Sequence, residues 1–547
     1  MSSSFDVSTL LCAGLGLLFG AACLALPSYR YRAFMSFVPM PDGASWIWGH
    51  EKIIFDSSTS TAYTRWYVTL GTYVIRVRGA LWKPDILVVA DPAAISHIMG
   101  KQIYQYGENV SVPCRGGSSP ATEHNDIVRP RIARLLGKSL GWVEGESEHK
   151  RMRHLVSSSL SQEAVKKGYQ DLLDAAENTR VAMEDYLHTS GTYADFKTVN
   201  ITEWTLQATL DAIGRFGFGH DFGGGRNKEA RALLGAWRDM VTSVISPDGF
   251  LAVMLIRRFG FINKLPLRAL RAQGNVRAII HAGVAKEMVL RDQNLSATSS
   301  GNDLLSRLLV AHKKGAIDKA ELMDHISMFI MAGSETTGQG VGSALYELGR
   351  NPGVQAKLRA EIMRFSQAPT FDELTGKMPY LDAVTRETLR FHPPAPYMER
   401  NSKIDDVLPL RHPITDKQGT VHTEIHIKAG QTVIIPIHSC NRLDSVWGDG
   451  GVFRPERWLD PAGPARHADM LTNGWSNTLS FSDGPRNCIG YRLALIEFKV
   501  ILLMFVRNFQ FGATGDPVMH KFASSMSPVI KGREKEGPQL PVTIAPL

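Results

Sequence analysis

The pattern of hydrophobic and polar positions begins with one uncharged run, residues 9–26, which is just long enough to span a bilayer as a helix. Two arginines follow the run closely, whereas a single aspartate precedes it. This charge distribution predicts a transmembrane anchor behind a lumenal tail (residues 1–8), with the body on the cytosolic side. A cleaved leader is the alternative, but it would have basic residues before the run and a small-x-small cleavage site.

Prolines at positions 39 and 41 follow the apolar run, and proline fixes φ and cannot continue a helix. We therefore expect residues 27–50 to form a stiff hinge and residues 51–547 to form the globular body.

Short segments with a period of two predict a small β region. Tyr73–Val77 and Asp85–Val89 surround a glycine turn and predict one hairpin. Ile425–Ile427 and Thr432–Ile435 are joined by Ala-Gly and predict a second hairpin.

Most of the remaining chain has helical periodicity, with the clearest patterns in Leu206–Phe222, Leu322–Gly349 and Tyr491–Phe505. Asp91-Pro92 has the residues of a helix start, with aspartate as cap and proline at the first position. Ser111–Asp126 is rich in Gly, Ser and Pro, which predicts a loop.

Composition narrows the class of protein. A length of 547 residues suggests two or more domains, and 44% apolar with 21% charged residues is typical of a globular chain. The formal charge of +8 suits an anionic membrane face or an acidic protein partner, and no dense Lys/Arg tract indicates nucleic acid. Five scattered cysteines without a C-x-x-C pair indicate neither a disulfide scaffold nor a zinc site.

The strongest chemical signal is F-x-x-G-x-R-x-C-x-G over Phe481–Gly490, directly before an apolar helical pattern. Cys488 lies at a helix start, where backbone N–H groups favour a thiolate. Gly484 and Gly490 let the backbone pass close to a large flat ligand, and Arg486 suits a carboxylate. A buried structural thiol is the alternative interpretation.

A second signal interrupts the long apolar helix near residue 335. Ala332 and Gly333 leave room for a flat ligand, and an acid and a hydroxyl, Glu335 and Thr336, follow them. We expect Thr336 to bond back to a carbonyl, to open the helix locally, and with Glu335 to transfer protons. The alternative is a threonine satisfied by its own helix beside a surface glutamate.

Two charged pairs occur at helical spacing. His149 and Arg153 share a helix face, although a solvated basic helix has the same pattern. Glu387 and Arg390 also share a face, and as a surface pair they would contribute little to stability.

Together these motifs resemble the cytochrome P-450 superfamily. The Phe481–Gly490 segment resembles its cysteine-ligand signature, and Ala332–Thr337 matches its A-G-x-[DE]-T-[ST] oxygen-activation motif. Glu387 and Arg390 match its E-x-x-R pair, and the motifs follow one another in family order. The resemblance implies a single catalytic domain, mainly α with a small β region, in place of several domains.

The resemblance also implies site roles. Haem b would have Cys488 as its axial ligand to iron, with His149, Arg153 and Arg400 near its propionates. Arg457 would complete a structural core with Glu387 and Arg390. The other positions implied to contact the haem are Phe481, Gly484, Arg486, Gly490, Ala332 and Gly333.

The implied reaction is monooxygenation, in which one atom of O2 enters a C–H bond of a lipophilic substrate. Since no flavin or nicotinamide motif is visible, electrons would come from a separate NADPH–cytochrome P-450 reductase, with cytochrome b5 as an optional further partner. The implied location is the endoplasmic reticulum membrane, with the catalytic domain facing the cytosol. Candidates for a basic docking face are Lys150, Arg151, Arg492 and Lys499.

The substrate is constrained only by an expected apolar lining. The candidate lining residues are Met328, Phe329, Ala332, Pro394, Ala395, Pro396 and Tyr397. The chain looks most like fungal microsomal members, many of which act on terpenoids or other secondary metabolites. Alternatives are oxidation of fatty acids or aromatic xenobiotics, a non-oxygenating isomerase or dehydratase, a haem carrier or sensor, and a structural membrane protein.

Overall fold

The computed structural model describes residues 35–107, 129–189, 196–265, 270, 273–294, 303–461 and 474–547. The expected anchor, the lumenal tail, the first part of the hinge and the loop at 111–126 lie outside the described residues.

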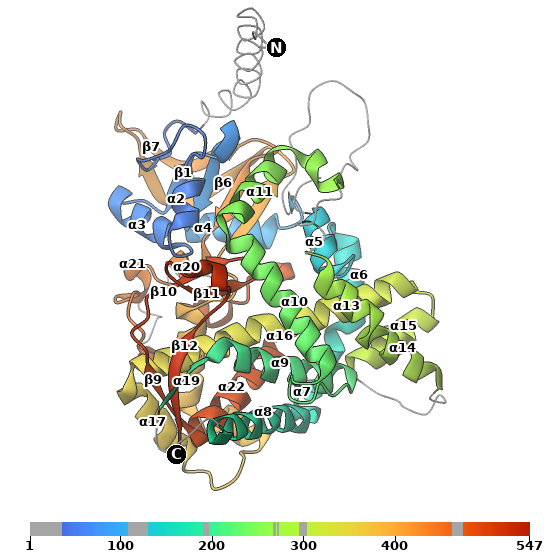
Figure 1. Cartoon of the computed structure of the whole chain (residues 1–547). Helices are drawn as coiled ribbons and strands as arrows, with labels where there is room; N and C mark the ends of the chain where they lie inside the picture. The colour runs from blue at the N-terminus through green and yellow to red at the C-terminus, as the bar shows by residue number, and fades with distance from the viewer. Residues whose placement is uncertain are drawn as a thin grey trace, which may run out of the picture.

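Helices make up most of the structure, and the 32-residue α16 (Lys319–Arg350) crosses its middle (Figure 1). Asp318 and Glu321 form a capping box that fixes the start of this helix. Helices α9 (Ile201–Phe218) and α22 (Tyr491–Asn508) both pack against it. Because neighbouring helices surround α16, most of its central residues are buried.

The other helices before α16 are α2 (Glu51–Asp56), α3 (Thr61–Leu70), α4 (Pro92–Ser96), α5 (Arg129–Leu136), α6 (Glu146–Ser157), α7 (Gln162–Lys167), α8 (Tyr169–Thr189), α10 (Lys228–Ile245), α11 (Pro247–Arg258), α13 (Asn275–Ala282), α14 (Val284–Asn294) and α15 (Leu304–Lys313). After it come α17 (Pro352–Ile362), α18 (Phe371–Gly376), α19 (Pro379–Phe391), α20 (Ile437–Cys440) and α21 (Asp444–Trp447). As predicted, Asp91 caps α4 by accepting hydrogen bonds from the Ala93 and Ala94 amides, with proline at the first position.

The main sheet has five strands in the order β1-β2-β8-β5-β3. These strands are β1 (Val74–Val77), β2 (Ile86–Val89), β8 (Thr432–Ile435), β5 (Met398–Ser402) and β3 (Tyr106–Gly107). The first predicted hairpin is confirmed, because Val74 of β1 pairs antiparallel with Val89 of β2.

The second predicted hairpin is wrong. Strand β7 (Val421–Ile427) pairs with β6 (Asp406–Thr415), whereas β8 lies between β2 and β5 in the main sheet. Three of the four β8 residues are fully buried, as in a central strand, but β7 is largely exposed and suits a two-stranded ribbon.

Two smaller sheets lie toward the C-terminal end of the chain. Strands β10 (Val518–Phe522) and β11 (Met526–Ile530) form a hairpin, and β4 (Lys197–Asn200), β12 (Pro541–Pro546) and β9 (Phe509–Ala513) form a three-stranded sheet. The predicted combination of a mainly helical body and a small β region is therefore present.

Among the described helices, none alone is long and apolar enough to cross a bilayer, although α10 and α11 pass that test together as a pair bent by 76°.

Candidate active site

Cys488 lies in a loop directly before α22, at one wall of an interior cavity of about 340 Å³. Its amide donates a hydrogen bond to the Phe481 carbonyl (2.8 Å), which closes the loop. Gly484 has φ +67°, and a Cβ there would lie 2.0 Å from the Met99 carbonyl oxygen, so this turn requires glycine. Phe481 supports the loop by packing edge-on against Trp475.

Burial raises the pKa of the Cys488 thiol, while the Gly490 amide and the Arg153 charge act in the opposite direction. The protein alone therefore does not favour the thiolate, contrary to the expectation from the helix start. A bound cation at the sulfur would supply the missing stabilisation, as a metal does for a coordinating thiol.

The opposite wall of the cavity belongs to α16, where Met328, Phe329, Ala332, Gly333 and Thr336 line it. The space beside Gly333 was expected to admit a flat ligand, but a residue of α9 occupies part of it. A Cβ there would lie 2.8 Å from Cγ1 of Ile213 on α9, so glycine is needed for helix packing as well as for the cavity.

The residues at this cavity fit a haem. The cavity has an accessible thiol on one side and a small-residue helix wall on the other. Gly490 lines it, and a Cβ at this position would meet no protein atom within 4 Å, so the free space beside the loop belongs to the cavity. Cysteinate is one of the known protein ligands of haem iron.

Two arginines line a cleft beside this cavity, where carboxylate groups of a ligand would be recognised. Arg486 lines both the cavity and an adjoining cleft, and Arg400 lines that cleft. Arg486 donates to the Val143 carbonyl (3.0 Å) and Arg400 to the Glu399 carbonyl (3.0 Å). Both cations are thereby held at the cleft, and their propionate role stays a prediction.

Of His149 and Arg153, only Arg153 bonds the cysteine loop directly. Arg153 donates to the Asn487 carbonyl (2.8 Å) and to Asn487 Oδ1 (2.6 Å), so it braces the residue before Cys488. His149 is buried with Nδ1 3.1 Å from the Tyr104 hydroxyl. Burial, Arg486 and Arg153 lower its pKa to about 4, so the ring is neutral at pH 7.

Thr336 lies on the cavity wall, and its hydroxyl donates to the Ala332 carbonyl (2.9 Å), as predicted. The expected local opening is absent from the helix, since α16 runs unbroken through this segment. Glu335 is buried, so the surface-glutamate alternative is wrong. Its carboxylate accepts hydrogen bonds from Ser524 (2.5 Å) and Ser525 (2.6 Å), and burial raises its pKa.

Glu387 and Arg390 form a fully buried pair with two contacts, Nε–Oε2 of 2.9 Å and Nη2–Oε1 of 2.8 Å. Arg457 donates from Nε to both Glu387 oxygens at 3.1 Å, and the Trp458 indole donates at 2.9 Å. The structure thus brings the three predicted core residues together in a network between α19 and the segment after α21.

Most of the expected substrate lining faces the cavity: Met328, Phe329, Ala332, Pro394 and Ala395 do. Pro396 and Tyr397 do not line it. The Pro396 carbonyl accepts from the His438 amide (2.8 Å), and Tyr397 faces a second, outer cavity of about 140 Å³.

Glu497 on α22 is a cavity residue that sequence reasoning missed. It is buried, lines the cavity, and its Oε1 has no hydrogen-bond partner in the part of the chain that is described. Burial raises its pKa well above the usual range, against a hydrogen bond from Thr337. The signal in the sequence was a single acid inside the apolar run of α22.

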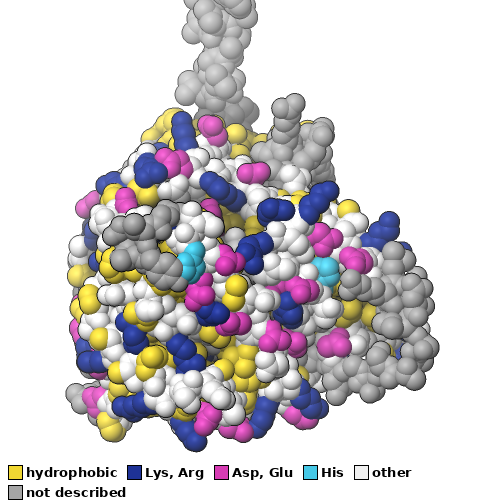
Figure 2. All heavy atoms as spheres, turned by 60° about the horizontal axis from the view of Figure 1, so that its bottom comes forward, with side chains coloured by type: hydrophobic (Ala, Val, Ile, Leu, Met, Phe, Trp, Pro, Cys, Tyr) yellow, Lys and Arg dark blue, Asp and Glu magenta, His cyan; other side chains and the backbone are white. Residues whose placement is uncertain are grey.

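Of the four residues predicted for a basic docking face, Lys499 is wrong and the other three stay a prediction. Lys499 is buried and bonds Asp382 (2.6 Å), while Lys150 pairs with Glu146 and Arg151 with Glu148 and Glu321. On the face drawn in Figure 2, basic and acidic side chains are interspersed. Arg492 is exposed over the Tyr491 ring.

The comparison with known families agrees with this geometry. The cytochrome P450 family model matches residues 111–531, which includes both cavity walls. The chain belongs to the cytochrome P450 family. Cytochrome P450 monooxygenase claU of Ampulloclitocybe clavipes is 30% identical over 530 residues, covering 94% of this chain and 93% of that protein. Cytochrome P450 monooxygenase 205 of Postia placenta is 28% identical over 544 residues, covering 93% and 92%.

This P450 chain is accordingly an oxidoreductase of the monooxygenase kind, and its family implies haem and O2.

Proposed function

We propose that this P450 inserts one oxygen atom from O2 into a C–H bond of a lipophilic substrate, a terpenoid or other secondary metabolite. The observation that carries the proposal is the interior cavity between Cys488 and Thr336, whose lining is predominantly apolar. An apolar cavity of this kind binds an apolar molecule, because burying apolar surface is favourable and few polar groups need partners.

The chain's own residues hold and orient the reactants. Cys488 would ligate the haem iron, Arg400 and Arg486 would bind its propionates, and Gly490 leaves space beside the loop. When bound, the haem supplies the activation of O2. The Thr336 hydroxyl, already bonded to the Ala332 carbonyl, holds a proton at the cavity wall, and Leu389 and Phe329 exclude water.

The proposal also covers the source of electrons and the cellular location of the enzyme. Electrons come from an NADPH-dependent reductase, with cytochrome b5 as an optional partner, and the enzyme sits in the endoplasmic reticulum membrane. The apolar run at residues 9–26 and the lack of flavin and nicotinamide motifs in the sequence support this arrangement.

The first test is the absorbance difference spectrum of the reduced, carbon-monoxide-bound protein beside a Cys488→Ala variant. We expect a thiolate-type Soret band that the variant lacks. A folded protein that binds no haem, or that keeps the band without Cys488, would contradict the assigned ligand.

The second test separates oxygen insertion from an isomerase or dehydratase. With reductase present, a monooxygenase consumes NADPH and O2 when a bound lipophilic substrate is converted. Substrate turnover without NADPH would instead favour the non-oxygenating alternative.

A further inference from the structure

His220 is a buried histidine whose ring nitrogens lack a partner of hydrogen-bond geometry among the described residues. It is 5% exposed, and the lack concerns both Nδ1 and Nε2. Buried polar groups are nearly always paired, and each exception calls for a ligand, an ion or a water. Oε2 of Glu229 lies 3.2 Å from Nε2, at ion-pair distance but without hydrogen-bond geometry.

The position of His220 is fixed by the end of α9. Gly219 adopts the left-handed conformation (φ +57°) that terminates the helix, and the His220 amide bonds the Gly214 carbonyl (3.0 Å). The imidazole packs edge-on against the Phe222 ring at 4.6 Å. The backbone hydrogen bond and the Phe222 contact thus keep the ring in the interior, where it is 5% exposed.

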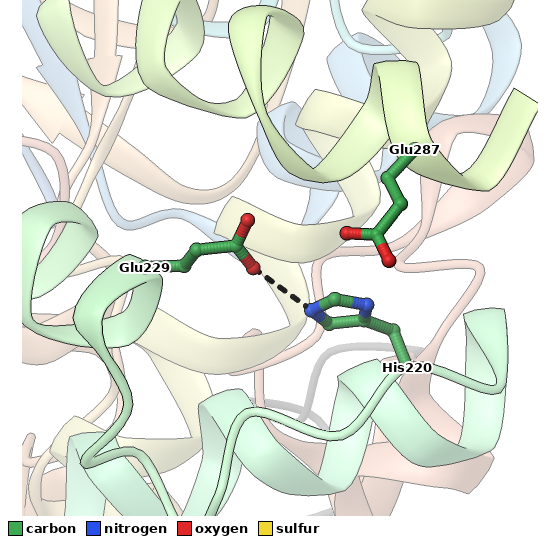
Figure 3. Close-up of side chains that lie close together, drawn as sticks. All are labelled: His220, Glu229 and Glu287. Carbon is green, nitrogen blue, oxygen red and sulfur yellow. Dashed lines mark ion pairs between the residues drawn. The ribbon is translucent and has the colours of Figure 1, made fainter. Parts of the chain in front are cut away.

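Two carboxylates from other helices face this ring. Figure 3 shows Glu229, from the first turn of α10, to the left of the imidazole and Glu287, from the first turn of α14, above it. Ligand atoms of the three residues lie within 4.8 Å of one another. A Cβ added at Gly283 would lie 3.4 Å from Glu229 Oε1, so this carboxylate reaches the junction between α13 and α14.

We propose that His220, Glu229 and Glu287 bind a divalent transition-metal ion, Zn²⁺, with water completing the coordination. Zinc accepts nitrogen and oxygen ligands at about 2.0–2.2 Å, which places neighbouring ligand atoms about 3.4 Å apart in a tetrahedron. The His220–Glu229 pair already has this separation, and a side-chain rotation of Glu287 closes the third position. The imidazole disfavours Mg²⁺ and Ca²⁺, which prefer oxygen ligands alone.

The ion would act as a structural clip. It joins the end of α9, where His220 already pairs with Glu229, to the starts of α10 and α14. Helix α9 carries Ile213, which lines the active-site cavity and contacts Gly333, so the clip stabilises one wall of that cavity from outside. The site is distinct from the cysteine loop and takes no part in the reaction.

The test uses the full-length, haem-loaded protein, stripped with a chelator, desalted and titrated with Zn²⁺ alone. Metal analysis and calorimetry should give one zinc per chain, and zinc should raise the apparent melting temperature. Glu229→Gln and Glu287→Gln should weaken zinc binding by more than about tenfold, since even outer-shell partners of metal sites contribute that much. Mg²⁺ at the same concentration should neither bind nor shift the melting temperature.

Glu163→Gln is the matched control, because Glu163 is an exposed carboxylate (80% exposed) paired only with Lys167 at 3.0 Å among the described contacts. It removes the same charge and should leave zinc affinity unchanged. Equal zinc affinity in wild type, Glu229→Gln and Glu287→Gln would overturn the site, as would a protein without stoichiometric zinc. Because both variants keep His220, the test holds even where a His220 variant does not fold.

Discussion

Glu335 and Thr336 are neighbours in the sequence, yet their side chains face different cavities. Thr336 lines the cavity that contains Cys488, whereas Glu335 lines a separate small cavity with Trp237 and bonds two serines from the β10–β11 turn. Successive residues of a helix point about 100° apart, so one motif necessarily serves two environments. The Thr336 hydroxyl is therefore placed for contact with molecules bound in the Cys488 cavity, whereas the Glu335 carboxyl is held outside that cavity.

Replacing Thr336 by alanine tests this division. Product formed per NADPH consumed should fall by about tenfold or more, the scale expected for a lost proton-transfer group. The apparent unfolding midpoint should hardly change, because the lost hydrogen bond is local to the helix. Thr336→Ser should restore most of the coupling, and an alanine variant with unchanged coupling would remove the hydroxyl from the mechanism.

The two glycines of the cysteine loop should respond differently to alanine. Gly484→Ala should prevent folding of the loop, because φ is +67° and the new Cβ would lie 2.0 Å from the Met99 carbonyl. Gly490→Ala meets no protein atom within 4 Å and should fold, but with less haem, because Gly490 lines the cavity. Circular dichroism and haem content per chain distinguish these outcomes, and equal behaviour of the two variants would contradict this account.

Residue types could be predicted from the sequence wherever one local motif carries the chemistry. Cys488, Gly484 and the Glu387–Arg390 pair belong to such motifs, because turn geometry and helical spacing are local properties. Residues that act through distant segments could not be predicted. Ser524 and Ser525, which bond Glu335, lie about 190 residues further along the chain, and nothing in their own sequence context marks them.

The pairing of strands and the orientation of side chains were the weakest predictions for the same reason. The pairing of β8 depended on which strands were buried. The burial of the Lys499 side chain depended on its ion pair with Asp382 of α19. Tertiary packing decides both, and patterns of charge and periodicity in the sequence carry no information about it.

Breaking the buried network around Glu387 should be costly. Glu387→Gln leaves the guanidinium group of Arg390 buried without a counter-ion among the described residues and leaves Arg457 with Asp449 alone (2.7 Å), and removing one partner of a buried pair costs about 3–5 kcal/mol. We expect a large fall in the urea midpoint and loss of haem on mild heating. Glu146→Gln, at an exposed pair with Lys150, should change neither, and a mild phenotype for Glu387→Gln would show that water compensates both arginines.

Stability should fall in acid because several histidines are buried in neutral form. Burial lowers the pKa of His325 from its ordinary value of 6.5 to about 4, and in the described chain neither ring nitrogen has a hydrogen-bond partner. Below pH 6.5 the unfolded chain takes up a proton that the folded chain refuses, so stability is lost as pH falls toward 4. This histidine alone should cost about 2 kcal/mol between pH 7 and pH 5.

A His325→Phe variant isolates that contribution. Its unfolding free energy should decline less steeply than that of the wild type over this pH range, measured by urea titration at each pH. His154→Phe is the control, because His154 is exposed, and it should keep the wild-type slope. Identical slopes for all three proteins would show that folding does not shift the pKa of His325.

Glu497 should be a neutral carboxylic acid at pH 7. Burial raises its pKa well above the usual range, and Thr337 is the hydrogen-bond partner that opposes this shift. Because the folded pKa exceeds the unfolded one, the proton stabilises the fold at low pH, and this contribution is lost as pH rises above about 4.5. Glu497→Gln, which mimics the protonated acid, should therefore gain stability relative to wild type between pH 5 and pH 9. The infrared band of a protonated carboxyl should be present in wild type at pH 7 and absent from Glu497→Gln, and a wild-type spectrum without that band would place a charge in the apolar cavity and contradict the assignment.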